Sequence, residues 1–147
     1  MIHFTKVRSV KSPVRAHSTD GGIDFFCPDD FGPITVKVGD SVKIPSGIKV
    51  IVPEGYALVA FNKSGVATNK GLDVSAQVVD IGYTGEVHIC FNKVSGDPIT
   101  INPGDKLVQF ILLKIGFDHP HEISNDDYER LTTGSERGQG GFGSTGV

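Results

Sequence analysis

The sequence has no long helical or apolar segment. No stretch keeps a 3.6-residue apolar period for long, which disfavours a helical bundle. No apolar run approaches the ~20 residues that a membrane-spanning helix needs. The first ten residues also lack the apolar centre of a secretory signal. We therefore expect one domain of ordinary size that is soluble and cytoplasmic and has no membrane partner.

Charge excess, paired cysteines and common catalytic motifs are also missing. A net charge of −3 and a pI near 5.9 argue against a broad nucleic-acid-binding face, but leave room for a small anionic ligand. Cys27 and Cys90 form no CxxC pair and have no zinc-site spacing, so we interpret them as reduced, partly buried thiols. The motifs GxSxG, HExxH and GxxxxGK[ST] do not occur.

Glycine and proline are abundant, with 19 and 8 residues, and they punctuate short β-rich runs. Many short strands separated by Gly/Pro turns predict an all-β sandwich or barrel. The expected strands are Ile34–Val38, Ser41–Ile44, Ile48–Val52, Tyr56–Phe61, Val74–Val79, Glu86–Phe91, Ile99–Ile101 and Leu107–Ile115.

Two short segments have helical character. Residues 64–69 predict one short helix ended by Gly71. Residues 124–131 are a second candidate, with Ser124 or Asn125 as N-cap and acidic residues in the first turn.

One sequence pattern occurs twice. Residues 33–42 and 98–107 both read P-I-T-[VI]-x-x-G-D-x-[VL], which describes a strand, a tight turn and the next strand. The repeat suggests a barrel with internal pseudo-symmetry. Chance similarity between two β-turns would explain it equally simply.

The tail, residues 132–147, consists mostly of glycine and polar residues, which is typical of a flexible arm. It can also be interpreted as a phosphate clamp, because successive backbone N–H groups of glycines cradle phosphate oxygens. Arg137 offers a fork for phosphate, Ser144 and Thr145 offer hydroxyls, and Phe142 could stack on a base.

Four other segments carry candidate polar residues. Lys63 and Ser64 lie at the predicted start of a short helix, where an anion could bind; the alternative is an ordinary cap with a solvated lysine. Asp80 ends an apolar strand, where a carboxylate can orient and deprotonate water, and Tyr83 follows in the turn, where it could stack on a sugar. The alternative is a turn-forming Asp with a packed Tyr.

The other two segments contain Asp24 and Gln109. Asp24 follows two glycines and could serve a metal-bound phosphate or brace a loop. Gln109 lies inside an apolar strand, where a buried amide needs partners, and it could be a structural residue only.

Together, and in this order, the five segments resemble the five signature segments of the trimeric dUTP pyrophosphatase (dUTPase) family. Residues 22–25 are similar to A-G-x-D-L, and residues 62–67 to x-R-S-G-L-A. Residues 74–85 resemble G-x-I-D-x-D-Y-x-G, and residues 104–110 resemble G-x-R-I-A-Q-L. Residues 137–146 match R-G-x-G-G-F-G-S-T-G almost letter for letter.

The resemblance implies a fold, an assembly and a reaction. It implies a jelly-roll-like β-barrel over residues 1–131, and an arm, residues 132–147, that closes over a neighbouring subunit's active site. It further implies a homotrimer with three shared sites and Mg²⁺ held mainly by the triphosphate. The implied reaction is hydrolysis of dUTP to dUMP and pyrophosphate by water attack on the α-phosphorus. This would limit uracil in DNA and supply dUMP for dTMP synthesis.

The resemblance also implies roles for individual residues. Asp80 would orient the attacking water, and Tyr83 would pack under deoxyribose and exclude a 2′-hydroxyl. Asp24 would support the metal indirectly. Uracil would be bound by Val74, Val79, His88 and the stacking Phe142; the phosphates would be bound by Lys63, Ser64, Gly65, Gln109, Arg137, Gly143, Ser144 and Thr145.

Two departures from the family pattern leave alternatives open. Lys63 stands where the family has Arg, and a lysine cannot fork onto two oxygens. Gly82 stands where the family has a second Asp, and the form D-x-G-Y-x-G also resembles the dCTP deaminases. A deaminase or a bifunctional deaminase–pyrophosphatase is therefore one alternative, although Cys90 stands where the deaminases carry a catalytic Glu. The others are a non-catalytic nucleotide-binding regulator and a structural protein on the same scaffold.

Overall fold

The computed structural model describes residues 1–141. The chain divides into two compact units, Met1–Gly116 and Phe117–Val147. The first contains all the strands that the structure describes, together with helix α1 (Ser64–Lys70), and the second contains helix α2 (Asn125–Thr132). No helix in the described part of the chain is long and apolar enough to cross a membrane.

The strands of the first unit are short and pair antiparallel. The largest sheet has the order β2-β11-β6-β8, and a second sheet has the order β4-β9-β7. Two further pairs are β1-β5 and β3-β10. The strands are β1 (His3–Lys6), β2 (Ile23–Asp24), β3 (Ile34–Val36), β4 (Ser41–Pro45), β5 (Ile48–Ile51), β6 (Tyr56–Asn62), β7 (Leu72–Val74), β8 (Val78–Val79), β9 (His88–Lys93), β10 (Ile99–Ile101) and β11 (Val108–Lys114).

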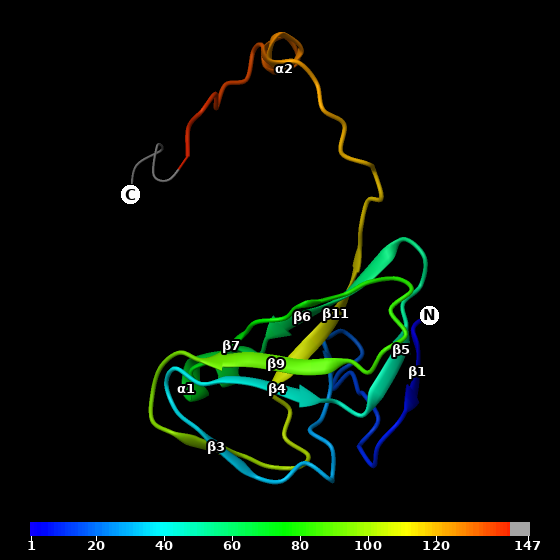
Figure 1. Ribbon diagram of the computed structural model, residues 1–147, viewed down its shortest axis with the longest axis vertical. Helices are drawn as coiled ribbons and strands as arrows, with labels where there is room; N and C mark the ends of the chain where they lie inside the picture. The colour runs from blue at the N-terminus through cyan, green and yellow to red at the C-terminus, as the bar shows by residue number, and fades with distance from the viewer. Residues whose placement is uncertain (142–147) are drawn as a thin grey trace. The chain divides into compact units, whose positions relative to one another are not determined.

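The two larger sheets form two layers, with β4, β9 and β7 in one layer and β6 and β11 in the other (Figure 1). Their inward side chains join one hydrophobic cluster that includes the fully buried Ile44, Leu58 and Ile89. Phe25 and Phe110 pack ring to ring at 4.5 Å between centroids. The jelly-roll-like all-β class is confirmed, although the strand ladders of the described residues do not close into one continuous barrel.

The strand predicted over Val74–Val79 is wrong as a single element. β7 pairs with β9, whereas β8 pairs with β6, so the chain crosses between the two sheets at residues 75–77. Backbone bonds hold this crossing, because Ser75 N donates to Cys90 O at 3.2 Å and Ala60 N donates to Gln77 O at 2.7 Å. Sequence periodicity describes an extended chain but carries no information on its partner strand.

Strands β1 and β2 were not predicted. All four residues of β1 are exposed, so the strand has no apolar alternation to reveal it. β2 has only two residues and is defined by its pairing with β11.

Both candidate helices form, so the expectation of one short helix is corrected to two. α1 begins at Ser64 and ends at Gly71, which adopts the left-handed conformation. α2 is capped by Ser124, whose hydroxyl accepts a hydrogen bond from Asp127 N at 3.1 Å.

The repeated sequence pattern corresponds to a local two-fold arrangement. β3 and β10 pair antiparallel about Thr35 and Thr100, which lie opposite each other. The turns that follow are alike: the Asp40 carboxylate accepts from Lys37 N at 2.8 Å, and the Asp105 carboxylate accepts from Asn102 N at 2.9 Å. The pseudo-symmetry interpretation is confirmed for these two strand–turn units.

Candidate active site

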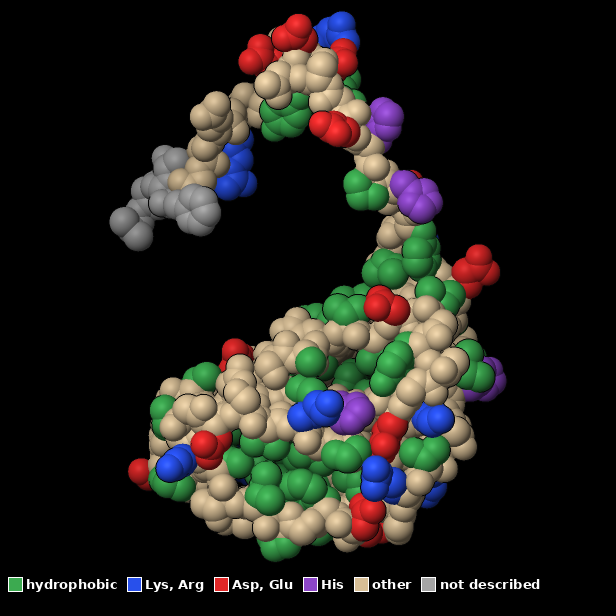
Figure 2. Space-filling model, viewed as in Figure 1, with side chains coloured by type: hydrophobic (Ala, Val, Ile, Leu, Met, Phe, Trp, Pro, Cys, Tyr) green, Lys and Arg blue, Asp and Glu red, His purple; other side chains and the backbone are tan. Residues whose placement is uncertain are grey.

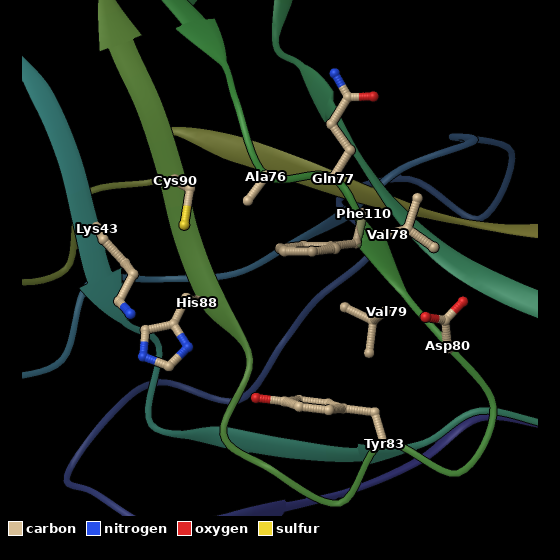
Figure 3. Close-up of a pocket in the computed structure, with 10 residues that line it drawn as sticks. All are labelled: Lys43, Ala76, Gln77, Val78, Val79, Asp80, Tyr83, His88, Cys90 and Phe110. Carbon is tan, nitrogen blue, oxygen red and sulfur yellow. The ribbon is translucent and has the colours of Figure 1, made fainter.

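A cavity of about 280 Å³ opens between β8, β9 and β4. In Figure 3, the rings of Tyr83 and Phe110 bound it on opposite sides, with Val79 between them. Lys43 and His88 lie on the side away from Asp80. The full lining is Lys43, Ala76, Gln77, Val78, Val79, Asp80, Tyr83, His88, Cys90 and Phe110.

A tight turn fixes Asp80 and Tyr83 at this cavity. Tyr83 N donates to Asp80 O at 3.2 Å. Gly82, within the turn, has φ +84°, a backbone conformation that residues other than glycine rarely adopt. The Tyr83 hydroxyl then donates to Glu86 O at 3.0 Å. A Cβ at Gly85 would lie 2.4 Å from that hydroxyl, so the ring's position requires glycine there. The glycines of D-x-G-Y-x-G therefore serve the turn and the tyrosine.

The far end of this turn is braced by an ion pair. Arg8 Nε donates to Glu86 Oε1 at 2.8 Å, and Gly47 N donates to the same carboxylate at 2.7 Å. Burial by itself would raise the pKa of Glu86, but these two contacts outweigh it and lower that pKa below its ordinary value. Glu86 therefore stays ionised and holds the return strand in place.

A second cluster surrounds Asp24 on β2. The residue is only 5% exposed, and each of its carboxylate oxygens binds one lysine. Lys63 pairs with Oδ1, and Lys106 Nζ lies 2.9 Å from Oδ2. Burial alone would raise the pKa of Asp24, but the two lysines more than compensate and hold the pKa below its usual value. Asp24 is thus an ionised brace that holds two cations at one point.

The amide of Gln109 ties the same region together. Its Nε2 donates to the Asn62 carbonyl at 2.8 Å, and a Cβ at Gly22 would lie 2.0 Å from its Oε1. Asn62 in turn donates to Asp73 Oδ1 at 2.7 Å and accepts from Val74 N at 2.8 Å. The expected phosphate residues from three separate segments therefore meet at one end of the β2-β11-β6 sheet.

Helix α1 begins beside this cluster without a side-chain cap. Lys63 is the N-cap residue and makes no side-chain capping bond, while Ser64 and Gly65 are exposed. The first N–H groups of the helix are therefore available to an anion.

The cavity and the Asp24 cluster are distant within one chain. Val79 on β8 pairs with Leu58 on β6. Lys63 follows Leu58 by five residues, so the backbone distance along β6 from Leu58 to Lys63 is ~17 Å at ~3.3 Å per residue. The sheet order also places β2 and β8 at opposite edges. Asp80 and Lys63 of one chain therefore lie toward opposite ends of β6.

The model of the dUTPase family matches residues 8–146. The chain belongs to the dUTPase family. The deoxyuridine 5′-triphosphate nucleotidohydrolase of Mycolicibacterium gilvum is 32% identical over 137 residues, covering 91% of this chain and 86% of that protein. The enzyme of the same name from Corynebacterium jeikeium is 30% identical over 138 residues, covering 92% and 85%.

Solved dUTPase structures share the fold. The dUTPase of Staphylococcus bacteriophage 80alpha with dUpNHpp superposes with a TM-score of 0.84 at 22% identity, covering 100% of this chain and 99% of that one. A variant of the phage phi11 enzyme of S. aureus, described with a structural Mg(II) ion, has a TM-score of 0.74 at 21% identity, covering 84% and 96%. The native EIAV dUTPase has a TM-score of 0.69 at 24% identity, covering 86% and 98%.

Among the expected site residues, Val79, Asp80, Tyr83 and His88 line the cavity, but Val74 does not. Val74 is buried in β7. Arg137 lies in the described part of the tail, where its Nε donates to Gly140 O at 2.8 Å. The expected contacts of Phe142, Gly143, Ser144 and Thr145 lie outside the described residues.

Sequence reasoning missed several residues of the site. Lys106 stands where the fourth dUTPase motif has arginine, but its pairing with Asp24 joins residues far apart in the sequence. Asn62 gave no signal, because its side-chain partners Asp73 and Val74 lie across helix α1 on the next strand, β7. Lys43 reaches the cavity only through the pairing of β4 with β9, whereas Cys90 lies two residues after the expected His88 on the same face of β9.

No cluster of three or more His, Cys, Asp or Glu side chains that could hold a metal ion occurs in residues 1–141. Both cysteines are free and buried, as expected. Burial raises the pKa of Cys27 to about 12. Burial also raises the pKa of Cys90, although nearby Lys43 opposes the shift.

Proposed function

We propose that this chain hydrolyses dUTP to dUMP and pyrophosphate. The observation that carries the proposal is Asp80, an exposed carboxylate at the edge of a cavity that Tyr83 and Phe110 bound. The cavity volume of about 280 Å³ lies at the small end of the range for ligand pockets. A space of that size suits one nucleoside. The names of the mycobacterial and corynebacterial relatives support the same reaction.

In this proposal Asp80 is the general base. It accepts a proton from a water molecule, whose oxygen forms a bond to the α-phosphorus. The bond from the α-phosphorus to the bridging oxygen breaks, and pyrophosphate leaves with the bonding electrons. Such a reaction depends mainly on positioning and charge neutralisation. Lys63 and the N–H groups of Ser64 and Gly65 position the phosphates and neutralise their charge. Gln109 holds the segment that carries these three residues, through its hydrogen bond to Asn62 O.

Magnesium fits as a partner of the triphosphate. The described residues provide no multidentate carboxylate cluster, and both oxygens of Asp24 already bind lysines. The phosphate oxygens would therefore supply most of the ligands, and Asp24 would act indirectly by holding Lys63 and Lys106. The bound ion would neutralise charge that develops on the leaving pyrophosphate.

We further propose that the working site is shared between chains of a homotrimer. The ~17 Å between the β8 and α1 ends of β6 favours an arrangement in which one copy provides Asp80 and another provides Lys63. The arm, residues 132–147, would close over a neighbour's site. In that role Phe142 stacks on uracil, while Arg137, Gly143, Ser144 and Thr145 bind the γ-phosphate.

Recognition of the nucleoside is assigned to the cavity. Tyr83 packs under deoxyribose and leaves no room for a 2′-hydroxyl. Uracil lies between Val79 and His88, where main-chain groups of the adjoining strands read its edge. Cytosine is rejected because its reversed donor and acceptor leave buried polar groups unpaired.

The chemistry at Cys90 weighs against a deaminase. The deaminases carry a catalytic Glu at the matching place, and proton transfer in that role needs a carboxyl group. Cys90 is 7% exposed, and burial raises its pKa, so it is a neutral thiol. It cannot replace a glutamate as acid and base at neutral pH.

The test is to incubate the protein with magnesium and each deoxynucleoside triphosphate in turn and to separate the products by chromatography. We expect consumption of dUTP only, with dUMP and pyrophosphate in equal amounts. Formation of dUTP or dUMP from dCTP would favour the deaminase alternative. Binding of dUTP without turnover would favour the non-catalytic regulator.

A further inference from the structure

Lys43 is a basic side chain at the cavity that the dUTPase resemblance did not assign. It lies in the middle of β4, opposite Cys90 on β9. Alternation along the strands puts Lys43, Cys90 and His88 on one face, while Ile44 and Ile89 are fully buried on the other. All three of the former residues line the cavity.

The positive charge of Lys43 is not paired with any carboxylate among the described residues. None of the ion pairs or side-chain hydrogen bonds of residues 1–141 involves its ammonium group. Figure 3 shows this side chain beside His88, on the side of the cavity opposite Asp80. In Figure 2 a basic side chain and a histidine adjoin in the same way on the face over β4 and β9.

The ends of the cavity therefore differ in charge. Asp80 is the only carboxylate in the lining, and Lys43 and His88 bring nitrogen groups to the other end. A nucleotide whose α-phosphate lies at Asp80 directs its base toward Lys43. An ammonium group has three hydrogen-bond donors and no acceptor. It suits the 4-carbonyl oxygen of uracil and is mismatched to the 4-amino group that cytosine carries in its place, whereas both bases share the 2-carbonyl.

We propose that Lys43 is a specificity-determining residue that donates a charge-assisted hydrogen bond to the 4-carbonyl oxygen of uracil. The inference rests on the proposed function, because it takes the cavity to be the nucleoside site. Lys43 adds a side-chain reader to the main-chain reading of the base. The ammonium group of Lys43 lies close to Cys90, because its charge lowers the pKa of that thiol against the effect of burial. This proximity agrees with a Lys43 side chain that points into the cavity.

The experiment compares Lys43→Met with a matched control, Lys49→Met. Lys49 is also an exposed lysine within a strand, β5, but does not line this cavity. For each variant with magnesium, kcat/KM is measured for dUTP and dCTP. The dissociation constants of deoxyuridine and deoxycytidine, which carry no phosphate, are measured by titration calorimetry. Thermal unfolding midpoints verify that both variants fold.

We expect Lys43→Met to lower kcat/KM for dUTP and the affinity for deoxyuridine by roughly 10- to 100-fold, the effect of one charge-assisted hydrogen bond. Deoxycytidine affinity should stay the same or rise, and Lys49→Met should match the unmodified protein. Unchanged deoxyuridine affinity overturns the inference. So does an equal loss for dUTP and dCTP, which would place Lys43 on a group that both nucleotides carry, a phosphate or the 2-carbonyl of the base. Failure of the unmodified protein to hydrolyse dUTP, with deoxyuridine still bound through Lys43, would instead overturn the proposed function.

Discussion

The two carboxylates at the site are held in opposite ways. Asp24 is buried, and each of its oxygens is engaged by a lysine. Asp80 is exposed, and its side chain has no hydrogen bond or ion pair within residues 1–141. A carboxylate saturated with cations can position other groups but has little capacity to accept a proton. A free carboxylate fixed by its backbone turn can do so.

Asp80 and Asp24 also differ in the contacts that hold them in place. Asp80 is placed by main-chain bonds and glycines, so its side chain remains unoccupied. Asp24 is placed by side-chain contacts from two other segments, so its charge is part of the fold. In the proposed mechanism, the chemical step and the binding of the phosphates can therefore be disturbed separately. The variants below test that separation.

The largest effect is expected at the free carboxylate. Asp80→Asn keeps the turn, because the turn uses the main-chain carbonyl, but removes the base. Turnover of dUTP should fall by roughly 10²–10⁴-fold while dUTP binding is retained. Steady-state kinetics and calorimetric titration measure the two quantities. Asp97→Asn, at an exposed turn before β10, is the control and should behave normally. A fully active Asp80→Asn protein would remove Asp80 from its role.

Removal of the arm should come next. A chain that ends at Glu136 lacks Arg137 and all the residues that follow, but keeps every strand of the first unit. It should fold and keep its oligomeric state, while kcat/KM falls on the order of 10²-fold because the triphosphate is less well positioned. Size-exclusion chromatography and kinetics test this. Normal activity would mean that the segment takes no part in the reaction.

The saturated carboxylate should affect stability more than chemistry. Asp24→Asn leaves Lys63 and Lys106 close together without their counter-charge. The cost should be about 1–3 kcal/mol of unfolding free energy, less than for a fully buried pair because the lysine side chains are 25% and 40% exposed. Urea unfolding at pH 7 measures it, again beside Asp97→Asn.

The same variant predicts a pH dependence. The folded pKa of Asp24 is lowered, so its contribution is complete above the unfolded pKa of about 4 and is lost as pH falls through the folded value. Asp24→Asn should therefore remove part of the loss of stability below about pH 4. An identical pH profile in the variant and the unmodified protein would contradict the pairing with the two lysines.

Sequence reasoning succeeded for elements whose cause is local. The helix at Ser64, the turn at Gly82 and the repeated strand–turn units all follow from residues near in sequence. It failed where the cause is a distant partner. The β7–β8 break and the position of Lys43 in the cavity both depend on which strands pair, and no local pattern encodes that choice.

The smallest effect is expected at Lys63, where the dUTPase family has arginine. A guanidinium could fork onto both oxygens of Asp24 and displace Lys106 from Oδ2. Lys63→Arg alone should change kcat/KM and stability little, within about 0.5 kcal/mol, because the total charge is unchanged. An inactive variant would mean that the ammonium of Lys63 contacts the phosphates in a way that arginine cannot copy.

A double variant shows whether two lysines replace one arginine. Lys106→Met should destabilise the protein when Lys63 is present, because Oδ2 of Asp24 then loses its partner. In the Lys63→Arg background the same change should cost less, since the fork satisfies both oxygens. Urea unfolding of all four proteins gives the coupling energy between the two positions. Additive effects would mean that each lysine acts independently on Asp24.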